Sequence, residues 1–71
     1  MEDQDLIHKA NQIAAFFAPY TEEEAVVGIA NHLEKFWERR MRKQLQSLAA
    51  AGKSSLDPLV LRALAEPNLA G

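Results

Sequence analysis

Apolar residues recur every three or four positions in the first part of the chain. The positions that share this spacing are Leu6, Ala10, Ile13 and Phe17, with Ile7 and Ala14 beside them. This period is typical of an amphipathic helix, which we expect over about residues 5–18. Asp3 or Asp5 is expected to cap its start. Pro19 should end it, because proline disfavours helical geometry at the preceding residue and has no N–H.

A capping-box signature, Thr21-Glu22-Glu23-Glu24, opens the second apolar stripe. In such a box the Thr21 hydroxyl accepts a hydrogen bond from the N–H of Glu24, and the Glu24 carboxylate accepts one from the N–H of Thr21. Three carboxylates also suit the positive end of a helix dipole, so the pattern favours a helix start over a metal or acid–base site. The stripe that follows contains Val26, Ile29, Ala30, Leu33 and Trp37, with Phe36 at its margin.

The end of this second stripe is not fixed by the sequence. Apolar residues continue through Met41, Leu45 and Leu48, and neither Gly nor Pro interrupts them before Gly52. Gly52 is a typical C-terminal cap. One long helix from Glu22 to Ala51 fits this pattern, and so do two helices with a bend near residues 38–40.

A short linker at residues 53–55 leads to the last helical segment. Asp57 is expected to be its N-cap and Pro58 its first helical residue. The apolar positions of this segment are Leu59, Val60, Ala63 and Leu64, and Pro67 should end it. Because no strand pattern occurs, the sequence predicts one all-α domain over residues 1–71, a small helical hairpin or bundle of three to four helices. Gly28 costs a helix about 1 kcal/mol relative to Ala, which suggests close helix packing there.

Composition narrows the class of protein. A chain of 71 residues buries only about 60% of its unfolded surface, so a binding partner would add stability that the core cannot. The sequence has no Cys, which excludes disulfides and thiolate metal sites. It has no apolar run of about 18 residues, so we expect no membrane span. The acidic, polar start is unlike a signal peptide, and we expect a cytoplasmic protein.

Charge is unevenly distributed along the chain. Residues 1–24 carry six acids and one base, whereas residues 35–53 carry six bases and one acid. Such a dipole could orient the protein on a partner, since complementary fields steer encounter. Solvated helix faces would explain the same charges equally well, and both interpretations stay open.

The most distinctive stretch is Phe36–Arg42, which holds the only Trp of the chain and three Arg. Trp, Arg and Met are enriched at protein–protein interfaces, and Trp and Arg are frequent hot-spot residues. We therefore predict a partner contact whose residues are Phe36, Trp37, Arg40, Met41 and Arg42. For Trp37 the alternative is the chain's own core, because it shares a helical face with Ile29 and Leu33. A second candidate contact is the segment at Leu56, Asp57 and Pro58.

No catalytic, cofactor-binding or metal-binding motif is found in the sequence. His8 and His32 lie in different predicted helices, and neither has a His or Cys at ligand spacing. We expect His32, which lies beside Leu33, to be a partly buried packing residue. The three Gly are isolated, so no phosphate-binding loop is present.

Three blocks of the sequence nevertheless resemble a known family. The blocks are Ala10–Phe17, Ala25–Leu33 with the following Phe36-Trp37 and Met41-Arg42 pairs, and Leu56–Val60. In order and spacing they resemble the delta subunit of cytosolic, NAD-dependent molybdenum or tungsten formate dehydrogenases, over nearly the whole chain. That family often has a Pro between the Trp and the Met-Arg pair, where this chain has Glu38-Arg39-Arg40.

The resemblance implies a place in a larger enzyme that oxidises formate to carbon dioxide and passes the electrons to NAD. It implies a large catalytic subunit with a molybdenum or tungsten pterin and iron–sulfur clusters, and beta and gamma subunits with flavin and further clusters. It also implies that the delta subunit is small, cofactor-free and structural. A maturation factor that leaves the finished enzyme is the nearest alternative. A nucleic-acid-binding module using Arg39, Arg40, Arg42 and Lys43 is disfavoured by the net acidic charge.

Overall fold

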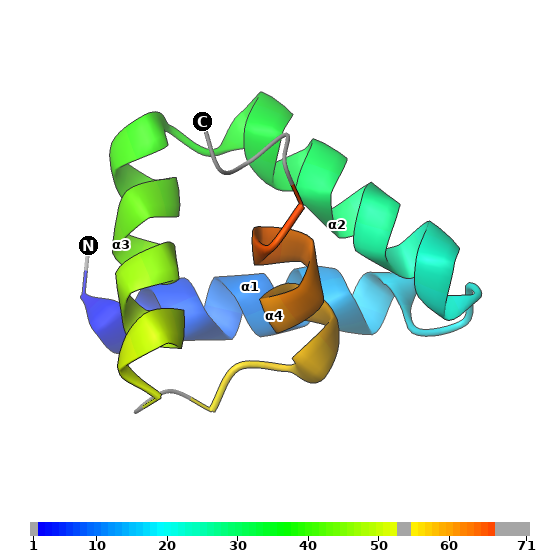
Figure 1. Cartoon of the computed structure of the whole chain (residues 1–71), viewed down its shortest axis with the longest axis horizontal. Coiled ribbons are helices and arrows are strands. Elements are labelled where there is room, and N and C mark those ends of the chain that lie inside the picture. The colour runs from blue at the N-terminus through cyan, green and yellow to red at the C-terminus, as the bar shows by residue number, and fades with distance from the viewer. Residues whose placement is uncertain (1, 53–54, 67–71) are drawn as a thin grey trace.

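The computed structural model describes residues 2–52 and 55–66, and every regular element in these two ranges is a helix. The helices are α1 (Asp3–Phe17), α2 (Glu22–Phe36), α3 (Arg39–Ala51) and α4 (Pro58–Leu64). Helix α1 is central, because α2, α3 and α4 all pack against it (Figure 1). Helix α4 also packs against α2, and α3 crosses the N-terminal half of α1 (Figure 1). The all-α prediction is confirmed.

The start of α1 differs from the prediction. Its N-cap residue is Glu2, whose side chain makes no capping hydrogen bond, so the assignment of the cap to Asp3 or Asp5 is wrong. The helix begins earlier than expected, which places both aspartates in its first turn. There they act on the positive end of the helix dipole, and the Asp3 carboxylate accepts a hydrogen bond of 2.8 Å from Nε2 of Gln44 in α3.

The turn between α1 and α2 follows the sequence signals closely. Helix α1 ends at Phe17, before Pro19, as predicted. Thr21 is the N-cap of α2, and its hydroxyl oxygen accepts a hydrogen bond of 3.2 Å from the N–H of Glu24. The return contact differs from the expected one, because the Glu24 carboxylate accepts from the Thr21 hydroxyl, at 2.9 Å, rather than from its N–H.

The second apolar stripe forms two helices. Trp37 (φ −101°, ψ 136°) and Glu38 (φ −66°, ψ 152°) are extended and separate α2 from α3 without any Gly or Pro. The Trp37 N–H still donates to the carbonyl of Leu33, at 3.1 Å, and completes the last helical bond of α2. The indole packs into the core cluster, and only 8% of Trp37 is exposed.

The last two helix ends agree with the prediction. Gly52 ends α3 in the left-handed region at φ 68°. The Asp57 carboxylate caps α4 by accepting a hydrogen bond of 2.9 Å from the N–H of Leu59, and Pro58 is the first helical residue. Helix α4 ends at Leu64. Pro67 and most of the predicted linker, Lys53 and Ser54, lie outside the described residues.

All four helices contribute to one core. Its largest fully buried side chains are Leu6, Ile29, Leu33, Leu45 and Val60. Close packing at Gly28 is confirmed, because a Cβ built there would lie 2.5 Å from Cε1 of Phe17. The absence of a side chain at Gly28 therefore allows the Phe17 ring of α1 to rest on the backbone of α2.

We expect Gly28→Ala to lower the free energy of unfolding by about 1 kcal/mol. Overpacking against Phe17 costs about 1–3 kcal/mol, and the gain in helix propensity offsets about 1 kcal/mol of that. In a Phe17→Ala background the clash is gone, so the same substitution should stabilise the protein by up to about 1 kcal/mol. Urea unfolding of the four proteins in this cycle measures both effects. An equal effect of Gly28→Ala in both backgrounds would contradict the contact.

Candidate partner-binding surface

The corner between α2 and α3 presents an aromatic ring and several cations to solvent. Phe36, the last residue of α2, is 73% exposed. Lys35, Arg39 and Arg40 are exposed in the same stretch, and they outnumber the exposed acids Glu34 and Glu38. The Arg side chains lie at the positive end of the α3 dipole, which increases the positive electrostatic potential of this surface. An exposed aromatic among cations is suited to an acidic protein surface.

The predicted contact residues of Phe36–Arg42 do not all lie on this surface. Trp37 is buried in the core cluster, and Met41 is half-buried against it. Arg42 is half-buried, and its Nη1 donates to the carbonyl oxygen of Glu34 at 3.4 Å. A guanidinium at this position satisfies a free carbonyl at the end of α2 and suits the negative end of its dipole. Phe36 and Arg40 are the exposed members.

The second predicted contact, at residues 56–58, contributes mainly to the fold of the chain itself. Leu56 is buried, Asp57 caps α4, and only Pro58 is exposed. Asn11 of α1 binds this segment through both the oxygen and the nitrogen of its side-chain amide. Its Oδ1 accepts from the N–H of Asp57 at 2.9 Å, and its Nδ2 donates to the carbonyl of Ser55 at 3.0 Å. The sequence analysis gave Asn11 no role, because these partners lie more than 40 residues away.

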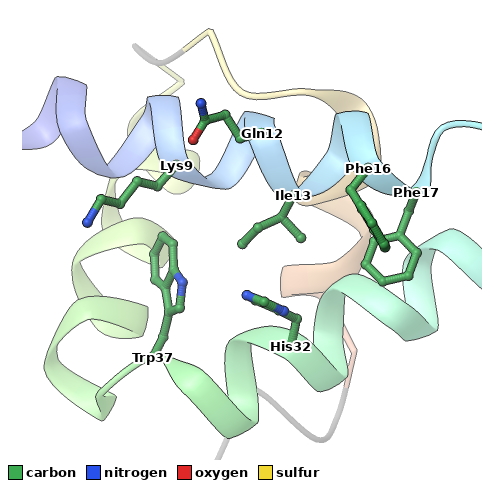
Figure 2. Close-up of a pocket in the computed structure, with 7 residues that line it drawn as sticks. All are labelled: Lys9, Gln12, Ile13, Phe16, Phe17, His32 and Trp37. Atoms are coloured by element: carbon green, nitrogen blue, oxygen red, sulfur yellow. The ribbon is translucent and has the colours of Figure 1, made fainter.

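A groove of about 540 Å³ lies between α1 and α2, on the side away from α4 (Figure 2). Five lining residues come from α1, one from α2, and one is the C-cap of α2; they are Lys9, Gln12, Ile13, Phe16, Phe17, His32 and Trp37. The apolar members form most of the surface, and no carboxylate lines it. Figure 2 shows Trp37 and Lys9 at one end of the groove and Phe16 and Phe17 at the other.

Exposed aromatic rings flank this groove. Phe16 is 69% exposed and packs edge-on against Phe17, with ring centroids 5.1 Å apart. His32 is half-buried, as expected, and its ring lies 4.8 Å from that of Phe36. Through this contact the groove is continuous with the α2–α3 corner. No local sequence pattern predicts the groove, because the groove depends on how α1 and α2 cross.

Other chemistry is sparse over residues 2–52 and 55–66. This part of the chain holds no group of three metal-ligating side chains, and none of its helices is long and apolar enough to span a bilayer. An exposed ion pair between Arg62 and Glu22 links α4 to α2. Such surface pairs contribute about 0–1 kcal/mol, so this one has little weight in the fold.

One protein family matches the chain. The model of the family described as NADH-dependent formate dehydrogenase delta subunit FdsD matches residues 5–64. The matched range includes α2, α3 and α4 in full and all but the first two residues of α1. No curated protein and no solved structure matches the chain.

Proposed function

Because the chain belongs to the family of NADH-dependent formate dehydrogenase delta subunits, we propose that it is a cofactor-free subunit that binds and stabilises the large catalytic subunit of such an enzyme. The match over four helices carries this proposal, because it covers the whole core and the α2–α3 corner. The proposed partners are the large metal–pterin subunit and, in the same cytoplasmic complex, beta and gamma subunits with flavin and iron–sulfur clusters.

The composition of the chain supports a non-catalytic role. Iron–sulfur clusters are held mainly by Cys thiolates, and the sequence contains no Cys and only two His. The two His also have different environments. His32 packs against Phe36, whereas His8 is an exposed residue of α1. In this proposal the other subunits carry out formate oxidation and electron transfer, and this chain stabilises them.

Binding to the folded catalytic subunit would stabilise that subunit by mass action. A binder present at 100 times its Kd contributes about 2.7 kcal/mol to the stability of its partner. We therefore expect a slower loss of formate-dependent NAD reduction at elevated temperature when the chain is present. The exposed aromatic and basic corner, at Phe36 and Arg40, is the contact that this proposal retains from the sequence prediction.

The test is to express the other subunits with and without this chain and to measure the half-life of activity during heating. A longer half-life with the chain, restored when purified chain is added to enzyme made without it, supports a stabilising subunit. Equal half-lives would contradict the proposal. If the chain is needed only during expression and adding it later has no effect, it acts as a maturation factor instead.

A further inference from the structure

We propose that the groove between α1 and α2 receives an amphipathic helix of the large catalytic subunit, with a carboxylate of that helix paired to Lys9. This inference rests on the proposed function, and it adds the groove as a second contact surface next to the corner at Phe36 and Arg40. Amphipathic helices bind other proteins in this way, by laying an apolar face into a groove.

Among the helices at residues 3–51 and 58–64, none covers the side of the α1–α2 pair on which the groove lies. Helix α4 packs against both α1 and α2 on one side, where Val60 and Ala63 are fully buried. The groove lies on the other side, and α4 is seen behind the pair in Figure 2. A helix of the partner would cover this side as α4 covers the first.

The side chains along the groove stand in rows that a third helix can fit. On α1, Lys9 and Ile13 are four residues apart, and so are Gln12 and Phe16. On α2, His32 is followed by Phe36 at the same spacing. Rows with this spacing form the ridges between which the side chains of a neighbouring helix insert. Among the residues that line the groove, Phe16 is a large apolar side chain that is 69% exposed, so covering it would bury much apolar surface.

The charges at the groove indicate which charges the partner helix should carry. Its polar lining residues are Lys9, Gln12 and His32, and none of the lining residues is acidic. At the α2–α3 corner, which begins next to Trp37, three bases (Lys35, Arg39 and Arg40) and two acids (Glu34 and Glu38) are exposed, so the corner has a small excess of positive charge. A helix with carboxylates toward the Trp37 end and apolar residues toward Phe16 is complementary to this pattern.

Two matched pairs of variants test the inference against purified large catalytic subunit. Phe16→Ala removes an exposed aromatic in the groove, and Val27→Ala removes an exposed apolar side chain of α2 that does not line it. Gln12→Glu adds a carboxylate inside the groove, and Gln4→Glu adds one to the same helix outside it. All four residues are exposed, so circular dichroism should show an unchanged fold.

We expect Phe16→Ala to weaken binding by roughly thirtyfold, the effect of about 2 kcal/mol that defines a hot spot. Gln12→Glu should weaken it through repulsion of the partner's carboxylate and competition for Lys9, whereas both control variants should bind like the wild type. If all four variants bind like the wild type, the groove is not the site, although the proposed function stands. If the wild type itself does not bind, the proposed function fails. A dimer of the free chain that Phe16→Ala dissociates would assign the groove to a second copy and overturn the inference.

Discussion

Replacing Trp37 with alanine is expected to unfold the isolated chain. The indole is 8% exposed and belongs to the core cluster formed by all four helices. Removing such a side chain costs about 3–5 kcal/mol, which equals the whole stability that a core of this size usually supplies. The helical signal at 222 nm should therefore fall toward that of an unfolded chain at 25 °C.

The neighbouring residue provides the control for this experiment. Phe36 is 73% exposed, so Phe36→Ala should change the free energy of unfolding by about 0.5 kcal/mol or less. The pair separates folding from binding, because Trp37→Ala removes both whereas Phe36→Ala affects only association. A Trp37→Ala protein with the helix content and urea midpoint of the wild type would show that the indole is not part of the core.

Replacing Leu45 with alanine is expected to release α3 from the rest of the protein. Leu45 is the one residue of α3 that is buried, and none of its surface is exposed. Leu→Ala at such a site costs about 2–5 kcal/mol. The hydrogen bond of 2.8 Å from Gln44 of α3 to Asp3 of α1 is exposed to water, and a single bond of this kind cannot offset the loss.

Hydrogen exchange distinguishes local release from global unfolding. In Leu45→Ala the amides of α3 should lose protection first, because few buried apolar contacts hold this helix. The exposed Lys43 serves as the control, and Lys43→Ala should leave α3 protected. Unchanged protection of α3 in Leu45→Ala would mean that contacts other than Leu45 attach it to α1.

Local sequence signals were sufficient for most of the fold. Apolar spacing predicts the buried faces of α1, α2 and α4. Apolar positions such as Leu6 and Ile29 recur at the helical period because one face of each helix is buried. Thr21, Gly52 and Asp57 marked helix ends since their side chains or backbone act within a few residues. The start of α1 was misplaced because several acidic residues there could each have been the cap.

The binding surface depends on contacts that no local signal reports. Phe36 and Trp37 are adjacent aromatics, yet one is 73% exposed and the other 8%. Burial of Trp37 agrees with the apolar stripe that it shares with Ile29 and Leu33, but the helix break at Trp37 and Glu38, which are extended without a Gly or Pro, has no local signal. The groove arises likewise from the crossing of α1 and α2, since Lys9 and His32 are brought together only by the tertiary fold.

In the function proposed above, this chain is a permanent subunit bound to the catalytic subunit of a formate dehydrogenase. Native mass spectrometry of the purified, active enzyme tests it most directly. We expect one 7.9 kDa chain to accompany each large catalytic subunit. A complex assembled with Phe16→Ala should lose this mass on dilution, whereas one with Val27→Ala should retain it. A fully active enzyme from which the 7.9 kDa mass is absent would contradict the claim.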